Sequence, residues 1–132
     1  ARTLSNAYSQ SLGTAFSTDV KPLEVEILVV QVGMNGQANE IFRISFDGSI
    51  VDEKNLAVIG GRSEAVQQYL REHASPQPPT LKDGLRRCHA ALEQVATQKI
   101  PSENLEVAVL DRNRQGRKFR RLSSADISQL FS

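Results

Sequence analysis

The sequence predicts an α+β fold with helices layered over stacked sheets, and two observations indicate it. The strongest strand candidate, residues 24–32, is apolar on both faces from Leu28 onward, so it lies inside the protein between two layers. Two helix candidates follow one another between groups of strands, one at 63–73 and one running from Thr80 to the stop at Ile100-Pro101. Buried strands with tandem helices are typical of helices packed on sheets.

The composition is that of one ordinary globular domain. The chain has 132 residues, of which 39% are hydrophobic and 23% charged, and its net charge of +1 by itself argues for no polyanionic partner. A single cysteine, Cys88, excludes an internal disulfide and fits a reducing compartment, so we expect the cytoplasm. No apolar run approaches the roughly 18 residues of a membrane span, so we expect no membrane partner.

The chain begins with a predicted helix at 2–16. Its apolar stripe comprises Leu4, Tyr8, Leu12, Ala15 and Phe16. Gly13 inside that helix indicates close approach of another backbone, either in the core or at a subunit contact. Lys21-Pro22 then breaks the chain before the strand at 24–32. At the entrance of that strand Glu24 and Glu26 share one face, which favours a solvated edge over an acid–base pair.

The stretch from 41 to 63 organises the middle of the chain. Phe42, Ile44 and Phe46 alternate with polar residues, as in a half-buried strand, and Asp47-Gly48 is a strong hairpin signal. We expect further strands at 49–52 and 56–59. Gly60-Gly61 then turns the chain, and Ser63 is the expected N-cap of the next helix. The sequence GGRS lacks both glycine-rich phosphate patterns, so we interpret it as a packing turn.

The helix at 63–73 is expected to bury a stripe of four residues: Ala65, Val66, Tyr69 and Leu70. After SPQPP ends it, Thr80 and Asp83 form a capping-box variant for the next helix. The seam of that helix repeats at 4-3-4-3 spacing through Leu81, Leu85, Cys88, Leu92 and Val95, so we expect Cys88 to be a small buried hydrophobe.

The residues predict no catalytic, cofactor or metal site. His89 follows Cys88 directly, but successive helical residues point about 100° apart, which disfavours a nucleophile–base pair. His73 is the only other histidine, so no metal-ligand cluster or Ser-His-Asp arrangement is expected.

The chain closes with a predicted strand at 105–110, a return strand at 118–122 and a short helix capped by Ser123 and Asp126. Six cations fall within the ten residues 112–121, among them Arg117 and Arg120. A basic hairpin can bind nucleic-acid phosphates, but single-strand binders add stacking aromatics, and only Phe119 is near. Phe119 is out of phase with the cations and is expected to face the core. A solvated or subunit-contacting hairpin is therefore favoured.

Three separated runs together resemble one known family. They are SNAYSQSLGTAF, IFRISFDGSIVDEKNLAVIGG and NLEVAVLDRNRQGRKFRRLSSADISQLF, and they occur in order and at fitting spacing. They resemble the α subunit of the 20S proteasome, of the actinobacterial kind, across essentially the whole chain. The resemblance implies a four-layer αββα sandwich of the N-terminal-nucleophile hydrolase type.

The family's subunit is about twice this length, so residues 1–132 resemble its C-terminal half as a single domain fragment. The chain looks cut or processed, because it starts abruptly in what reads as the middle of a helix. The rest of the subunit is therefore expected as a separate or unseen segment. The family's gate and its lysine-containing activator pocket lie in the half that no position here matches.

The resemblance also implies a function. An α subunit would be a non-catalytic, structural part of a threonine-type endopeptidase complex. Its ring of seven would template the β subunits, limit entry to unfolded protein substrates and dock a ring-shaped ATPase activator, with substrates tagged by Pup. The helix at 2–16 would lie near the contact with the β ring, with Tyr8, Gln10 and Gly13 as candidates. Arg117 and Arg120 would touch a neighbouring α subunit.

Two alternatives remain open. One is a catalytic, β-type subunit whose N-terminal nucleophile lies in the missing half, since here Ala1 comes first and Thr3 lies in the predicted helix. The other is a nucleic-acid-binding module that uses the basic hairpin. The first would show a free threonine after a cleaved propeptide, and the second a steep salt dependence of binding to single strands.

Overall fold

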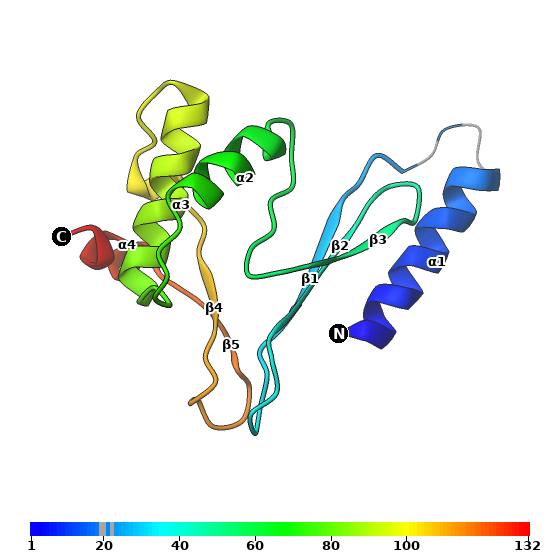
Figure 1. The fold of residues 1–132 in the computed structure, drawn as a ribbon, viewed down its shortest axis with the longest axis horizontal. Coiled ribbons are helices and arrows are strands. Elements are labelled where there is room, and N and C mark those ends of the chain that lie inside the picture. The colour runs from blue at the N-terminus through cyan, green and yellow to red at the C-terminus, as the bar shows by residue number, and fades with distance from the viewer. Residues whose placement is uncertain (19–20, 22) are drawn as a thin grey trace. The chain divides into compact units, whose positions relative to one another are not determined.

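The computed structural model describes residues 1–18, 21 and 23–132 (Figure 1). Pro22, part of the predicted chain break, lies outside the described residues. The chain divides into two compact units, 1–61 and 62–132, and each is described by itself. Helices and antiparallel sheets in both units confirm the α+β class.

Unit 1 consists of one helix on one face of an antiparallel sheet. Helix α1 spans Arg2–Thr18, and strands β1 (Ile27–Gln31), β2 (Glu40–Ile44) and β3 (Ile50–Glu53) pair in the order β1-β2-β3. Phe42 and Ile44 of the central strand are fully buried, because they have a strand on either side and α1 above. Leu12 of α1 and Val29 of β1 complete the core.

The predicted Asp47-Gly48 turn joins β2 to β3 and is confirmed. The Gly48 N–H donates to the Ser45 carbonyl oxygen at 2.9 Å, and Gly48 has φ +86°, which glycine adopts without steric cost. The Asp47 carboxylate accepts the Ser49 N–H at 2.9 Å, and this hydrogen bond lowers the pKa of Asp47. The turn is therefore fixed by its own side chain as well as by its backbone.

Two expectations for unit 1 are corrected. Strand β2 ends at Ile44, so Phe46 is exposed and packs edge-on against the exposed ring of Phe16 at 5.8 Å between centroids. The strand expected at 56–59 is not formed. Asn55 turns the chain away with φ 68°, and no described strand pairs with this segment. A strand needs a hydrogen-bonding partner, and sequence alternation alone does not supply one.

Unit 2 contains the remaining helices and a two-stranded sheet. Helices α2 (Ser63–Glu72) and α3 (Leu81–Ala96) pack on each other, and the 3₁₀ turn η1 (Ser102–Asn104) follows. Strands β4 (Ala108–Leu110) and β5 (Phe119–Arg121) form the hairpin, and α4 (Ser124–Phe131) ends the chain against η1 and α3. Its buried apolar residues are Val66, Ala91, Leu122 and Ile127.

Polar caps start two of these helices as the sequence predicts. The Thr80 hydroxyl accepts the Asp83 N–H at 3.1 Å and donates to its carboxylate at 2.6 Å, while Ser123 and Asp126 form a reciprocal capping box. These hydrogen bonds lower the pKa of both carboxyl groups. The Ser63 cap is wrong: Ser63 is the first helical residue, and Arg62 occupies the N-cap without a side-chain hydrogen bond.

The predicted apolar seam of α3 is not the face that unit 2 buries. Ala91 is fully buried, whereas Leu81 and Leu92 are 42% and 40% exposed and Cys88 is exposed. The expectation of a buried Cys88 is therefore wrong within this unit. Ala91 lies about 60° from Cys88 around the helix, on the side that the rest of unit 2 covers.

Candidate functional site

Helix α1 approaches the sheet with Leu12 and a set of small residues, and not with Leu4 or Tyr8. Ser5 and Leu12 are buried, and the Ser9 hydroxyl donates a hydrogen bond to the Gly48 carbonyl oxygen. A Cβ on Gly48 would lie 2.8 Å from the Cα of Gly13 and 2.6 Å from the Ser9 carbonyl oxygen. The predicted close approach at Gly13 is therefore with the β2–β3 turn.

One flank of the buried face of α1 exposes large residues. Leu4 is 52%, Tyr8 42% and Phe16 46% exposed, so the predicted core stripe is wrong for these three positions and correct for Leu12. The physical reason is that backbones at Gly13 and Gly48 meet only if the small-residue face points inward. The hydrophobic pattern of the helix did not reveal this, because the deciding partner lies 35 residues away (Gly13 to Gly48).

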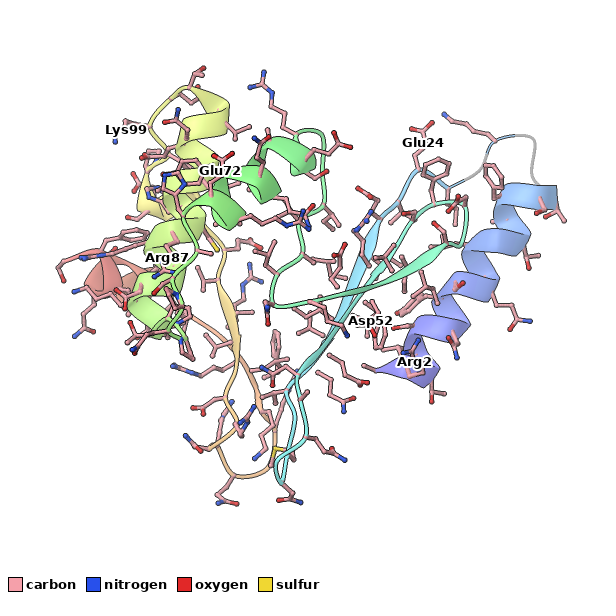
Figure 2. The ribbon with its side chains drawn as sticks, in the orientation of Figure 1. Arg2, Glu24, Asp52, Glu72, Arg87 and Lys99 are labelled. Atoms are coloured by element: carbon pink, nitrogen blue, oxygen red, sulfur yellow. The ribbon has the colours of Figure 1, made fainter. Side chains whose placement is uncertain are left out.

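The exposed face of α1 carries no charge. Arg2 is the only charged side chain in the helix, and it lies over the Phe42 ring at 4.5 Å and pairs with Asp52 at 3.7 Å. Figure 2 shows Arg2 beside Asp52. From Thr3 to Thr18 the surface of the helix is therefore uncharged, with Leu4, Tyr8 and Phe16 as its large apolar groups.

The three predicted contact residues of α1 do not share one face. Tyr8 and Gln10 are both exposed, but two helical steps separate them by about 200°. Gly13 is half-buried and faces Asp47 and Gly48, its ideal Cβ lying 3.6 Å from the Asp47 carbonyl oxygen. Leu4, which sequence reasoning assigned to the core, is one turn from Tyr8 and exposed beside it.

Glu26 departs from the solvated edge predicted for it. Glu24 is exposed (Figure 2), but Glu26 is half-buried and lies 3.9 Å from Arg43 of β2. Its other oxygen accepts the N–H of Gly60 at 3.3 Å. The glycine turn thus offers this N–H to an internal carboxylate, in keeping with its interpretation as a packing turn.

Much of the basic hairpin is bound to the hairpin itself. Lys118 donates to the carbonyl oxygens of Arg112 and Arg114, and Arg114 donates to that of Phe119 at 2.9 Å. Arg121 pairs with Glu106. These contacts engage several of the cations within the hairpin. Fewer cations are therefore available to bind an external polyanion.

The two predicted hairpin residues have different surroundings. The Arg117 guanidinium lies 5.4 Å from the centre of the Phe119 ring, and both residues are exposed. The expectation that Phe119 faces the core is therefore wrong: within the described residues no layer covers this side of β5. Arg120 is exposed and its charge contributes to lowering the pKa of Asp126, after the Ser123 hydrogen bonds.

Cys88 and His89 are separated in their interactions. The His89 Nε2 lies 2.7 Å from the Ile100 carbonyl oxygen and 3.7 Å from Glu93, and desolvation by the surrounding protein raises the pKa of the Cys88 thiol, although the residue is exposed. Glu93 accepts the Ile100 N–H at 2.9 Å, which is the main cause of its lowered pKa, with Lys99 second. Among the described residues no group of His, Cys, Asp and Glu side chains could hold a metal ion.

An open apolar groove of about 360 Å³ lies along α3. Leu81, Leu85, Cys88 and Leu92 line it from the helix, and Leu105 and Val107 from the segment before β4. The groove contains four of the five residues of the predicted seam, all but Val95. No described helix is long and apolar enough to cross a membrane.

Comparison with known proteins decides the family. A family model described as proteasome subunit matches residues 2–110. The chain belongs to this family. Relatives named "Proteasome subunit alpha" match it over its full length: that of Thermomonospora curvata is 42% identical, that of Streptosporangium roseum 42% and that of Sanguibacter keddieii 43%. The chain covers 57%, 51% and 53% of these three proteins, or about half their length.

Membership of the proteasome family confirms the resemblance seen in the three sequence runs. It also accounts for the mixed composition of helices and antiparallel sheets, which fits part of an N-terminal-nucleophile hydrolase fold. These three relatives are from actinobacteria, the kind that the sequence resembled.

Proposed function

We propose that this chain is part of a non-catalytic α subunit of a 20S proteasome core particle. The observation that carries the proposal is the match of the whole chain to relatives named proteasome subunit alpha. The subunit would be a structural component of a threonine-type endopeptidase complex, with catalysis supplied by separate β subunits. The arrangement of Cys88 and His89 supports this assignment, because His89 is directed to Ile100 and not to the thiol.

The uncharged face of α1 supports a docking role toward a β subunit. Interface cores are depleted in charged residues and enriched in tyrosine relative to other protein surface. Leu4 and Tyr8 would form the apolar centre of this contact, and Gln10 would lie at its flank. Gly13 would not touch the β subunit itself. It would support the contact by allowing α1 to lie close to the β2–β3 turn.

The hairpin would serve a second contact, with the neighbouring α subunit of a seven-membered ring. Arg117, over the exposed ring of Phe119, offers a cation and an apolar surface together. Arg120 is exposed on β5. Arginine and aromatic residues are enriched at such interfaces, and this favours a protein partner over a nucleic acid.

The whole protein would carry the broader roles that the resemblance implies. As a ring it would template β-ring assembly, limit entry to unfolded chains and receive a ring-shaped ATPase activator. The substrates would be cytoplasmic proteins tagged with Pup. These roles rest on the family resemblance, and so does the placement of α1 near the β ring, which the exposed uncharged residues of α1 support.

The test is assembly with the β subunit of the same organism, followed by native mass spectrometry. The wild-type protein should form a particle of many hundreds of kilodaltons that contains both chains. Leu4→Arg or Tyr8→Arg should lower the assembled fraction at least about tenfold, because each buries a charge in the contact. The matched control is Gln68→Arg, at an exposed helical position where arginine can still pair with Glu72.

Three results would contradict the proposal or a part of it. Assembly by both arginine variants at the wild-type level would remove α1 from the β contact. Peptide hydrolysis by this protein without β subunits would favour the catalytic alternative. Binding of single-stranded nucleic acid with a steep salt dependence would instead support the hairpin alternative.

A further inference from the structure

Unit 1 has two turns in which a glycine follows a side chain that can close a ring on the main chain. Asn35-Gly36 lies in the loop between β1 and β2, and Asp47-Gly48 lies in the turn between β2 and β3. Both glycines have a positive φ, +83° at Gly36 and +86° at Gly48. The two pairs share their chemistry, so their surroundings decide which of them reacts.

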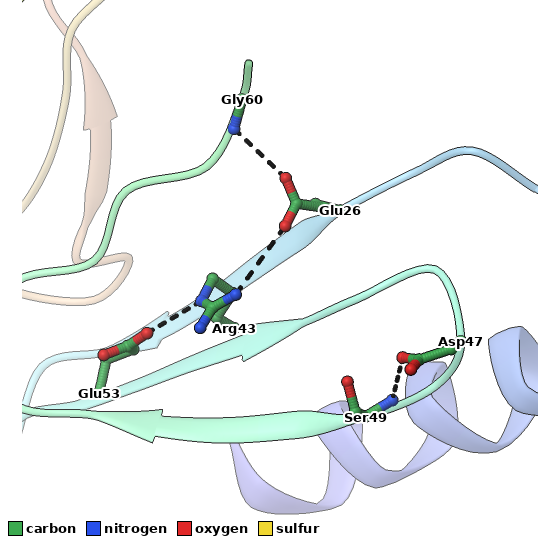
Figure 3. Close-up of polar contacts among 6 residues, drawn as sticks. All are labelled: Glu26, Arg43, Asp47, Ser49, Glu53 and Gly60. Carbon is green, nitrogen blue, oxygen red and sulfur yellow. Dashed lines mark hydrogen bonds and ion pairs between the residues drawn. The ribbon is translucent and has the colours of Figure 1, made fainter. Parts of the chain in front are cut away.

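The Asp47-Gly48 turn is held by several contacts. The Asp47 carboxylate accepts the Ser49 N–H at 2.9 Å (Figure 3). The Gly48 N–H donates to the Ser45 carbonyl oxygen at 2.9 Å, and the Ser9 hydroxyl of α1 donates to the Gly48 carbonyl oxygen. The Asp47 side chain cannot turn toward the Gly48 nitrogen unless these contacts break.

The Asn35-Gly36 turn is open by comparison. Both residues are exposed, and a Cβ on Gly36 would meet no atom within 4 Å. The turn is closed by one hydrogen bond between its neighbours, from the Gln37 N–H to the Met34 carbonyl oxygen at 3.0 Å. Neither the Asn35 side chain nor the Gly36 N–H forms a hydrogen bond with another described residue. The Gly36 nitrogen and the amide that it could attack are therefore adjacent and uncovered.

The base of the same loop is tightly packed. An ideal Cβ on Gly33 would lie 2.0 Å from the Gln37 carbonyl oxygen, and the Gly33 N–H donates to the Asn39 side-chain oxygen at 3.0 Å. Asn39 therefore holds the loop, and it is followed by Glu40, the first residue of β2. A chemical change at the tip would leave this base, and the pairing of β1 with β2, in place.

We propose that Asn35 is a site of spontaneous covalent modification. The Gly36 nitrogen attacks the carbonyl carbon of the Asn35 side chain, and a new C–N bond forms while the C–N bond of the amide breaks. The amino group leaves as ammonia and takes the Gly36 proton with it. Water then opens the resulting succinimide at either carbonyl and gives aspartate or isoaspartate, with a new negative charge at the loop tip.

The residue types fit this reaction. Asparagine is a thermolabile residue, and glycine, which has no Cβ, leaves the attacking nitrogen uncrowded. Loop tips are also where a chain best tolerates a change in its covalent structure. The inference does not depend on the proteasome assignment.

Mass spectrometry of peptides from the full chain, incubated in warm and mildly alkaline buffer, tests the proposal. The matched variant is Asp47→Asn, which puts the same Asn-Gly pair into the covered turn, where the amide oxygen can still accept the Ser49 N–H. Each amide is followed in the folded chain and in urea. Isoaspartate in the product identifies the succinimide route, because direct hydrolysis gives aspartate alone.

The two positions should differ strongly in the folded chain. Asn35 should react at most about tenfold more slowly than in urea, because only one backbone hydrogen bond closes its turn. The amide at position 47 should react at least about 100-fold more slowly than in urea, because several hydrogen bonds, one of them from α1, must break first.

Each outcome decides the proposal. Isoaspartate at Asn35 with an intact amide at position 47 supports it. An intact Asn35 amide in the folded chain, or equal slowing at the two positions, overturns it. If Asp47→Asn does not fold, isoaspartate is measured at Asp47 of the wild-type chain, since aspartate before glycine closes the same ring with loss of water. Isoaspartate must then accumulate at Asn35 and not at Asp47, and any other distribution overturns the proposal.

Discussion

The two units of this chain are held together in different ways. Unit 1 has one contiguous core, in which Leu12, Val29, Phe42 and Ile44 pack under a helix whose backbone touches a turn. Unit 2 depends more on side-chain hydrogen bonds at the ends of its helices. The apolar face of α3 is left uncovered and forms an open groove. A closed core resists single changes on its surface, whereas a unit closed by hydrogen bonds should respond to pH. The predictions below test that contrast.

The largest effect is expected from emptying the unit 1 core. Phe42→Ala removes a fully buried ring from the central strand, and we expect the free energy of unfolding to fall by about 3–5 kcal/mol. Phe119→Ala in unit 2 removes a ring that is 43% exposed, and we expect less than about 1 kcal/mol. Urea unfolding of both variants measures the difference. Equal losses would show that β5 is as well covered as β2.

The next effect concerns the contact between α1 and the β2–β3 turn. Gly48→Ala would place a Cβ 2.6 Å from the Ser9 carbonyl oxygen, at a residue with φ +86°. We expect a loss of roughly 3 kcal/mol in the free energy of unfolding, from the steric clash and backbone strain together.

Gly36→Ala is a matched control for this clash. Gly36 has φ +83° but open space around it, so only the backbone strain of about 1–2 kcal/mol should appear. Identical losses for the two variants would contradict the close approach of α1.

A smaller effect is expected from acid, and it should fall mainly on unit 2. Asp83, Glu93 and Asp126 have lowered pKa values there, whereas Asp47 is the corresponding group in unit 1. A carboxyl whose pKa is lower in the folded state stabilises the fold above its unfolded pKa. That stability is lost as the pH falls through the folded-state pKa, below ordinary values of 3.8 for aspartate and 4.5 for glutamate.

Acid titration followed by amide exchange measures this difference. The amides of α3 and α4 should lose protection before those of β2 as the pH falls below about 4.5. Replacing the three unit 2 carboxylates by their amides should flatten that dependence. Earlier loss in β2 would contradict the contrast between the units.

The smallest effect is expected at the open groove. Leu92→Gln changes a residue that is 40% exposed, so the free energy of unfolding of this chain should change by about 0.5 kcal/mol or less. Leu12→Gln, at a position 4% exposed in unit 1, is the contrasting variant and should be severely destabilising. A large loss for Leu92→Gln would show that another surface covers the groove.

The features that could be predicted from sequence are those with local causes. The Asp47-Gly48 turn and the caps at Thr80 and Ser123 depend on residues two or three positions apart, and all three form as expected. Family membership could also be predicted from the sequence, because three runs of the chain resemble the family.

The features that were missed depend on distant partners. The burial of Ser5 in place of Leu4 depends on where the hairpin turn meets α1, and the role of Glu26 depends on the register that brings Arg43 close. The open face of α3 depends on which neighbours are present to cover it. Helical periodicity gives the faces of an element, but not which of them is covered.

The hydrogen bond from Ser9 to Gly48 has a consequence for the order of folding. It spans 39 residues, whereas the β2–β3 turn closes through Ser45 and Ser49. Short-range closures form faster than long-range ones, because less chain entropy is lost in making them. The acceptor that α1 uses exists only after the hairpin has closed. The helix should therefore dock late, onto a hairpin that is already formed.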